Sequence, residues 1–137
     1  MFSLTREAID SKEMAAPSAG AWVVFEGRVR NENEGRAVAR LEYEAFDELA
    51  MKEGSAILEN AMRFPILRAE CVHRLGTLQI GDVAIRVDVL AGHRDEAFAA
   101  CKWIVDEVKS RVPIWKKEHY VEGGAGWVGV DEHQVSK

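Results

Sequence analysis

Cationic side chains gather in the last third of this acidic chain, next to large apolar residues. Residues 110–120 read SRVPIWKKEHY, so that Lys116 and Lys117 follow a proline, an isoleucine and a tryptophan. Lys109 stands seven residues before Lys116. We expect the segment after Pro113 to be extended, which makes Lys116 and Lys117 face opposite ways. One of the two amines should therefore point toward the core or a pocket, and the other toward solvent.

Lys109 and Lys116 are the candidates for acid–base chemistry. Lys109 lies at the end of a predicted helix, one tight turn before the extended segment, so its amine can approach that of Lys116. Two amines that are close together and partly desolvated, here by Trp115, lose proton affinity by ~1–3 pKa units. Such a lysine exchanges a proton near neutral pH or attacks a carbonyl group. The alternative is that both lysines are solvated, as is common after a helix.

Two arginines form a second candidate site in the stretch GRVRNENEG. Arg28 and Arg30 are two residues apart on a predicted strand, so they share one face of it. Two guanidinium groups on one face favour an anion between them, which predicts an anion-binding site at the edge of the following loop. The alternative is that they pair with Glu42 or Glu44 across a strand ladder.

A histidine and an arginine mark a third candidate site, where a strand is predicted to end and a helix to begin. His93 and Arg94 would stand beside free backbone N–H groups at the positive end of the helix dipole. Arg94 can also hold a phosphate through two parallel hydrogen bonds. The alternative is an ordinary helix start, because Asp95 and Glu96 already complement the dipole.

No metal or cofactor is predicted from the remaining reactive residues. Cys71 and Cys101 are far apart in sequence and lie in apolar patterns, which is typical of packing residues. His73 and His93 lack neighbouring ligands at metal-binding spacing. The EGGAG stretch follows an extended segment and not a strand-to-helix turn, so we interpret it as a hairpin link.

Composition limits the classes of function. The chain has 137 residues, a formal net charge of −5 and a sequence pI of about 5.4. General nucleic-acid binders are usually basic, so a local cation cluster in this chain indicates a pocket for a small anion. No signal peptide and no stretch that could span a bilayer is found. We expect one domain over residues 1–137, with little signal in 1–20 and 131–137, and a soluble cytoplasmic protein with reduced thiols.

The hydrophobic pattern predicts an α+β fold with strands and helices in the order β-β-α-β-β-α-β-β. Short links favour a largely antiparallel or mixed sheet arrangement. One or two helical turns are expected between residues 9 and 20, and 31–36 and 76–82 are expected to be links. In the second helix the predicted buried stripe is Ala97, Phe98, Cys101, Ile104, Val105 and Val108. The six predicted strands of this order span 21–30, 37–46, 66–76, 82–90, 113–121 and about 127–130, and the helices span about 47–64 and 93–112. Weak alternation at 2–6 indicates a further short strand before them.

Three stretches together resemble one known family. They are FEGRVRNENEGRAVARLEYEAF, the run from HRLGTLQIGD to VPIWKKE at residues 73–118, and the late Trp127. The chain resembles, over about residues 20–127, the large subunit of molybdopterin synthase, the MoaE family. The resemblance implies an α/β hammerhead-like fold with an additional antiparallel β-sheet, in which two main helices pack on the strands.

The resemblance also implies a reaction and its partners. The family is a sulfurtransferase that adds two sulfurs to cyclic pyranopterin monophosphate, which forms the dithiolene of molybdopterin. The sulfur arrives as a thiocarboxylate on the C-terminal Gly-Gly of a small ubiquitin-like carrier subunit. The large subunit is a homodimer within a heterotetramer, and it needs no metal or other cofactor of its own. No nucleic acid and no membrane is implied.

Residue by residue, the resemblance implies a site built from all three cationic segments. Arg30 matches the family's arginine at the end of its GxVR stretch. His93 and Arg94 match the pair that binds the substrate anion, and Lys109 and Lys116 match the two catalytic lysines. Three residues line the same pocket with weaker individual claims: Arg28, Lys117 and Glu118. Two alternatives stay open, namely a non-catalytic module that binds a phosphorylated metabolite or an acidic protein tail, and a lysine enzyme of the Schiff-base type.

Overall fold

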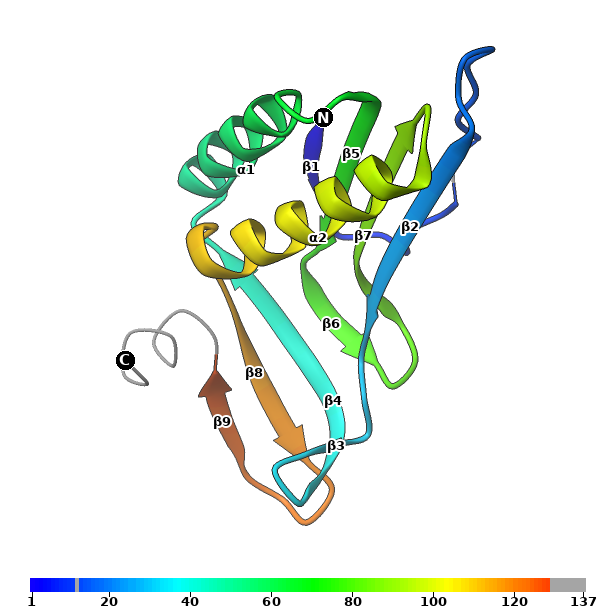
Figure 1. Ribbon diagram of the computed structural model, residues 1–137. Helices are drawn as coiled ribbons and strands as arrows, with labels where there is room; N and C mark the ends of the chain where they lie inside the picture. The colour runs from blue at the N-terminus through cyan, green and yellow to red at the C-terminus, as the bar shows by residue number, and fades with distance from the viewer. Residues whose placement is uncertain (12, 129–137) are drawn as a thin grey trace.

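The computed structural model describes residues 1–11 and 13–128 (Figure 1). These residues form an α+β fold of two sheets and two helices, as the sequence predicts. Gly129 and Val130 of the predicted last strand, and the tail after them, lie outside the described residues. The elements are β1 (Phe2–Thr5), β2 (Ala21–Arg28), β3 (Glu32–Asn33), β4 (Arg36–Ala45), α1 (Asp47–Ala61), β5 (Ile66–Arg74), β6 (Gly76–Gln79), β7 (Val83–Ala91), α2 (Arg94–Arg111), β8 (Ile114–Tyr120) and β9 (Ala125–Val128).

The first sheet is mixed and carries both helices on one face. Its strand order is β1-β5-β7-β2, with β1 parallel to β5 and the other neighbours antiparallel. Figure 1 shows α2 crossing in front of this sheet, and α1 beside β1. The main core lies between the two layers, and its largest fully buried side chains include Phe2, Ile57, Val87, Val89 and Ile104. This layer of helices on one face of a sheet is the α+β architecture.

The second sheet is antiparallel and extends away from the helices. Its strand order is β3-β4-β8-β9, and β6 also pairs with β4. A smaller apolar cluster, which includes Val38, Leu41 and Leu78, joins this sheet to the first one. Strand β8 begins only three residues after α2 ends, because Pro113 cannot continue a helix. This break brings the C-terminal end of α2 next to the start of β8 (Figure 1).

Helix α2 packs through small and branched side chains. Its buried residues are Ala97, Ala100, Cys101, Ile104, Val105 and Val108, which follow the spacing of a single helical face. The prediction that Phe98 belongs to this stripe was wrong, because its side chain is 60% exposed. Position 98 lies about 100° round the helix from position 97. Alanines at 97 and 100 bring the helix close to the sheet and leave the phenyl ring at the flank.

Four other local predictions need correction. The described part of residues 9–20 contains no helix, only a turn at Pro17 and Ser18 closed by a hydrogen bond from Ala19 N to Ala16 O (3.0 Å). The expected loop 31–36 contains β3 and a tight hairpin, in which both Glu34 and Gly35 have positive φ. The expected link 76–82 contains β6, which pairs with β4. Strand β2 ends at Arg28 and not at Arg30.

Neither α1 nor α2, the helices of the described residues, is long and apolar enough to cross a membrane.

Candidate active site

A cavity of about 380 Å³ opens where the end of α2, the start of β8 and the ends of β2 and β5 meet. We call it the lysine pocket. Its polar lining is Arg28, Arg30, Tyr43, His73, Lys109 and Lys116, and the other lining residues are apolar side chains and Gly27. Four of the eight residues predicted for the site thus share one cavity. They come from three segments that are far apart in sequence.

The two predicted catalytic lysines lie near each other in this pocket. Lys109 belongs to the last turn of α2, and Lys116 is the third residue of β8. Burial lowers the pKa of Lys109, and the positive charge of Lys116 lowers it further. Within residues 1–11 and 13–128, no hydrogen bond or ion pair joins either amine to another side chain. The arrangement therefore contains two amines without a carboxylate between them.

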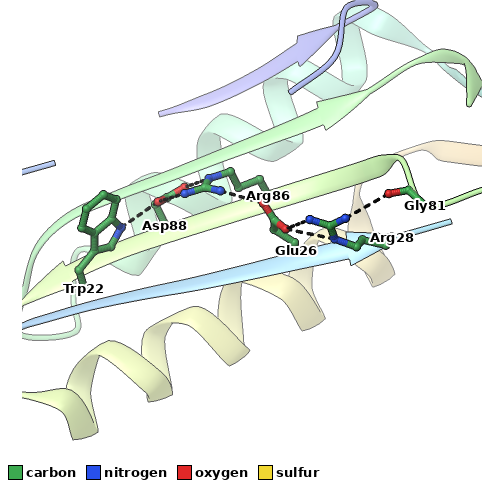
Figure 2. Close-up of polar contacts among 6 residues, drawn as sticks. All are labelled: Trp22, Glu26, Arg28, Gly81, Arg86 and Asp88. Carbon is green, nitrogen blue, oxygen red and sulfur yellow. Dashed lines mark hydrogen bonds and ion pairs between the residues drawn. The ribbon is translucent and has the colours of Figure 1, made fainter. Parts of the chain in front are cut away.

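Arg28 is held in the wall of the pocket by its own strand. Its Nε and Nη2 atoms donate to Glu26 Oε1 at 3.2 and 2.6 Å, and its Nη1 donates to the carbonyl oxygen of Gly81 at 3.2 Å (Figure 2). The alternative pairing of this arginine with Glu42 or Glu44 was wrong. Strand β2 pairs with β7, whereas the strand that carries Glu42 and Glu44 belongs to the other sheet.

A chain of alternating charges continues from Arg28 across the sheet (Figure 2). Glu26 Oε2 accepts a hydrogen bond from Arg86 Nη1 at 2.8 Å. Arg86 donates from Nε and Nη2 to the two oxygens of Asp88 at 2.9 and 3.2 Å, and Trp22 Nε1 donates to Asp88 Oδ2 at 2.8 Å. The hydrogen bond from Arg28, together with Arg86, holds the pKa of Glu26 below its usual value. This charge chain, Trp22–Asp88–Arg86–Glu26–Arg28, reaches the pocket at Arg28, which is the member that lines it.

Arg30 lies two residues beyond the end of β2 and lines the same pocket. Its side chain is exposed, and no hydrogen bond or ion pair connects it to another of the described residues. Arg28 and Arg30 therefore differ, because a carboxylate neutralises the first and none neutralises the second. Arg30 is the guanidinium of this pocket that is available to an incoming anion.

His93 and Arg94 do not line the lysine pocket. They stand at the N-terminal end of α2, whereas Lys109 belongs to its last turn. The helix rises 1.5 Å per residue, so the fifteen steps from Arg94 to Lys109 correspond to about 22 Å. Figure 1 shows α2 running across one face of the first sheet, with its two ends toward opposite edges of that sheet.

Lys117 and Glu118 also lie outside the pocket lining. The ammonium of Lys117 lies 5.4 Å from the centre of the Trp127 ring, on the β8–β9 pair. Glu118 is buried and accepts hydrogen bonds from Asn33 Nδ2 and from the hydroxyl of Tyr120, both at 2.9 Å. Glu118 thus ties the β3–β4 hairpin to β8.

His73 and Tyr43 belong to the pocket, although the sequence did not single them out as site residues. The His73 side chain is buried, its Nδ1 lies 2.9 Å from the carbonyl oxygen of Arg74, and its ring meets the edge of Tyr43 with centroids 5.0 Å apart. Burial lowers the pKa of His73 to about 4 and raises that of Tyr43 to about 12. The imidazole is therefore neutral, and the phenol protonated, at neutral pH.

Metal chemistry has no ligand set here. No group of three or more His, Cys, Asp or Glu side chains suited to a metal ion occurs within residues 1–11 and 13–128. The pocket instead combines cations with one neutral imidazole. Such a site attracts anions, exchanges protons through its amines and stabilises negative charge that develops during a reaction.

The chain was compared with known proteins. The family model described as "MoaE protein" matches residues 4–111. A molybdopterin synthase catalytic subunit of Pyrococcus abyssi is 50% identical over 121 residues, which is 88% of this chain and 81% of that protein. One from a Nostoc species is 36% identical over 136 residues, covering 94% of this chain and 82% of the relative.

Solved structures agree with this result. Molybdopterin synthase from Staphylococcus aureus superposes with a TM-score of 0.85 at 34% identity, over 92% of this chain and 95% of that one. A Helicobacter pylori complex of subunits 1 and 2 of molybdopterin-converting factor has a TM-score of 0.75 at 20% identity, over 96% and 90%, and supports the fold alone.

The fold and the pocket define an α+β protein with a cavity whose polar lining is mostly lysine and arginine side chains. The chain belongs to the MoaE family, as the family match and its similarity to the catalytic subunits of molybdopterin synthase show.

Proposed function

We propose that this chain is the catalytic subunit of a molybdopterin synthase. It transfers sulfur from the C-terminal thiocarboxylate of a small ubiquitin-like carrier ending in Gly-Gly to cyclic pyranopterin monophosphate, which forms the dithiolene. Family membership supports this function, and the observation that carries it is the convergence of Lys109 and Lys116 in one pocket. Cys71 and Cys101 are both free thiols, which fits a reducing compartment such as the cytoplasm.

The pocket's cations take separate parts in this reaction. Arg30, with Arg28 behind it in the wall, binds the cyclic phosphate by charge and hydrogen bonds. Lys109 and Lys116 exchange protons with the reacting groups and stabilise the negative oxygen that forms when the phosphate ring opens. The lowered pKa of Lys109 makes its ammonium group a stronger proton donor than that of an ordinary lysine. The partner supplies the sulfur nucleophile, so no cysteine of this chain has to react.

His93 and Arg94 enter this scheme through a second copy of the chain. About 22 Å of helix separates them from the lysines of their own chain, so they cannot hold the same small ligand. In a homodimer at the centre of a heterotetramer, these residues complete the pocket of the neighbouring protomer. Lys117 and Glu118 act at the rim, where they position β8 and the lysine that it carries.

Reconstitution tests the activity. Purified chain, thiocarboxylated carrier and cyclic pyranopterin monophosphate are mixed, and molybdopterin is measured as its oxidised fluorescent derivative. Lys116→Ala should reduce the rate by about 10²–10⁴-fold, the usual contribution of a positioned acid–base group. Lys102→Ala is the matched control, because Lys102 is an exposed lysine paired with Asp106 on the outer face of α2. Normal dithiolene formation by Lys116→Ala with weakened ligand binding would favour a non-catalytic anion-binding module.

Subunit mixing tests the contribution of the second copy. Lys116→Ala and Arg94→Ala homodimers are each expected to be nearly inactive. In a symmetric dimer, a hybrid of the two variants has one pocket with both native residues, so random mixing should restore about a quarter of the native sites. If both residues served the same protomer, every pocket of the hybrid would lack one of them. Mixing would then restore nothing, which would contradict the proposed arrangement.

A further inference from the structure

The proposed sulfur transfer creates a bond that must be broken again, and the inference below rests on that proposed function. When the carrier's thiocarboxylate sulfur attacks a substrate carbon, the sulfur is bonded both to that carbon and to the carrier's terminal carbonyl group. This linkage is a thioester. Water must cleave it before the carrier can leave, and the attacking water must give up a proton. The pocket therefore needs a proton acceptor as well as cations.

His73 is the lining residue with the geometry of an acceptor. A carbonyl oxygen only accepts, so the 2.9 Å contact with Arg74 O requires the proton on Nδ1 and leaves a lone pair on Nε2. No hydrogen bond of Nε2 occurs among residues 1–11 and 13–128. Among these residues, the buried side-chain nitrogen without a partner is Nε of Arg74, and not Nε2 of His73. It is therefore open to the cavity that His73 lines, although only 8% of the residue is exposed.

The other polar residues of the pocket are poorer acceptors. Arginine has no acceptor atom, and an ammonium group only donates. Tyr43, from β4, packs against the imidazole and keeps its proton. Burial lowers the pKa of the imidazole most, and the positive charge of Lys109, from α2, lowers it further, so the ring is neutral in the empty pocket. A phosphate and a thiocarboxylate that bind to the lysines offset this effect and raise the proton affinity of the ring.

We infer that His73 is a further catalytic residue of this site, whose Nε2 accepts the proton of the water that releases the carrier. The water oxygen bonds to the terminal carbonyl carbon as its proton passes to Nε2, and the carbon–sulfur bond of the acyl group breaks. The sulfur keeps the electron pair and stays on the substrate as a thiolate. The carrier leaves with a carboxyl group, which loses its proton to solvent, and the imidazolium returns its proton to solvent as well.

Two substitutions separate the lone pair of Nε2 from the rest of the side chain. His73→Asn keeps an N–H near the position of Nδ1 and removes the acceptor at Nε2. His73→Gln places an amide oxygen near the position of Nε2, which accepts a hydrogen bond but cannot take a proton at neutral pH. In a single turnover with thiocarboxylated carrier and substrate, both variants should accumulate the carrier–substrate thioester. Intact-mass spectrometry detects it as the carrier mass plus the substrate, and hydroxylamine cleaves it.

The expected result is at least a tenfold slower decay of this adduct, with its formation changed much less. Added imidazole should speed the decay in His73→Ala and have little effect on the native protein. His119→Gln is the matched control, because His119 contacts Glu42 and Arg40 outside the pocket and should leave adduct decay unchanged.

Two results would overturn the role of His73. One is a folded His73→Gln variant that releases carrier at the native rate, and the other is a loss of turnover in both variants without any adduct. If the native chain itself forms no molybdopterin with carrier and substrate, the proposed function fails instead. The two failures are therefore distinguishable.

Discussion

Replacing Arg86 by methionine should destabilise the fold strongly, because Arg86 is the central cation of the charge chain. Its side chain is 10% exposed and bridges Asp88, which is 5% exposed, to Glu26, which is 27% exposed. Methionine keeps most of the aliphatic stem and removes the charge. Glu26 then still has Arg28 as a partner, whereas Asp88, among the described residues, keeps only the hydrogen bond from the N–H of Trp22.

The size of the effect follows from the carboxylate of Asp88, which stays buried without an ion-pair partner. Removing one partner of a buried ion pair costs about 3–5 kcal/mol. Glu70 lies opposite Asp88 in the β5–β7 register and adds like charge, but Arg68 pairs with it. Of the two carboxylates that Arg86 bridges, Asp88 loses its cation and Glu26 keeps Arg28. We therefore expect a cost at the lower end of this range, about 3 kcal/mol. At about 2.1 cal/mol/K per residue, a chain of 137 residues has an unfolding entropy near 0.29 kcal/mol/K, so Tm should fall by about 10 °C.

Urea and thermal unfolding of Arg86→Met, Asp88→Asn and the double variant measure this cost. The double variant has neither the Arg86 cation nor the Asp88 carboxylate, so no buried charge is left without a partner. Its loss in free energy of unfolding should therefore be smaller than the sum of the two single losses by at least about 1 kcal/mol. The exposed pair Lys102–Asp106 is the matched control, because exposed pairs contribute about 0–1 kcal/mol. A loss below about 1 kcal/mol for Arg86→Met, or costs that simply add, would refute the reasoning.

Three further predictions concern packing and protonation. Gly54→Ala should lower the free energy of unfolding by about 1–3 kcal/mol in urea titrations, because an added Cβ would lie 2.3 Å from the Phe2 ring. This clash outweighs the roughly 1 kcal/mol gain in helix propensity. Unchanged stability would contradict this packing. His73 has a folded pKa of about 4, against 6.5 for an ordinary histidine, so the unfolded chain binds more protons between these values and stability rises with pH there. The native protein should therefore lose about 3 kcal/mol more than His73→Gln as pH falls from 6.5 to 4, and parallel curves would contradict it. Lys116→Gln removes a positive charge that lowers the pKa of Lys109, so NMR titration of the Lys109 amine should give a higher pKa than in the native chain, and an equal or lower value would argue against their proximity.

Local patterns predicted much of the fold and the centre of the site. Alternation in the strands and a 3.6-residue period in the helices gave both helices, the longer strands and the α+β class, but not the short strands β3 and β6. The position of Lys109 in the last turn of α2, followed by Pro113, was enough to bring it near Lys116 on β8. Sequence spacing predicts this contact because only a short turn separates the two elements. Arg28 and Arg30 were assigned to the same pocket only through the family resemblance, and the structure brings them there.

What the sequence did not reveal depends on contacts between strands that are distant along the chain. Arg86 and Asp88 interrupt an otherwise apolar strand, VAIRVDVLA, which was the visible signal of a buried polar group. Their partner became identifiable only from the register that places Glu26 opposite Arg86. His73 likewise appeared as one histidine of an apolar strand. Its part in the pocket depends on Tyr43 and Lys109, which approach it from the second sheet and from α2.

The charge chain also explains how an acidic protein maintains an anion-binding pocket. Carboxylates neutralise the arginines at the pocket's outer wall, where Glu26 holds Arg28, but no described carboxylate forms an ion pair with Arg30, Lys109 or Lys116. Repulsion between the two amines lowers the stability of the empty fold, and functional sites commonly reduce stability in this way. An anion that binds between them removes this repulsion only in the folded state and therefore stabilises the protein. In the proposed function, the arrangement that makes the pocket unfavourable when empty is thus the source of its affinity for a phosphate and a thiocarboxylate.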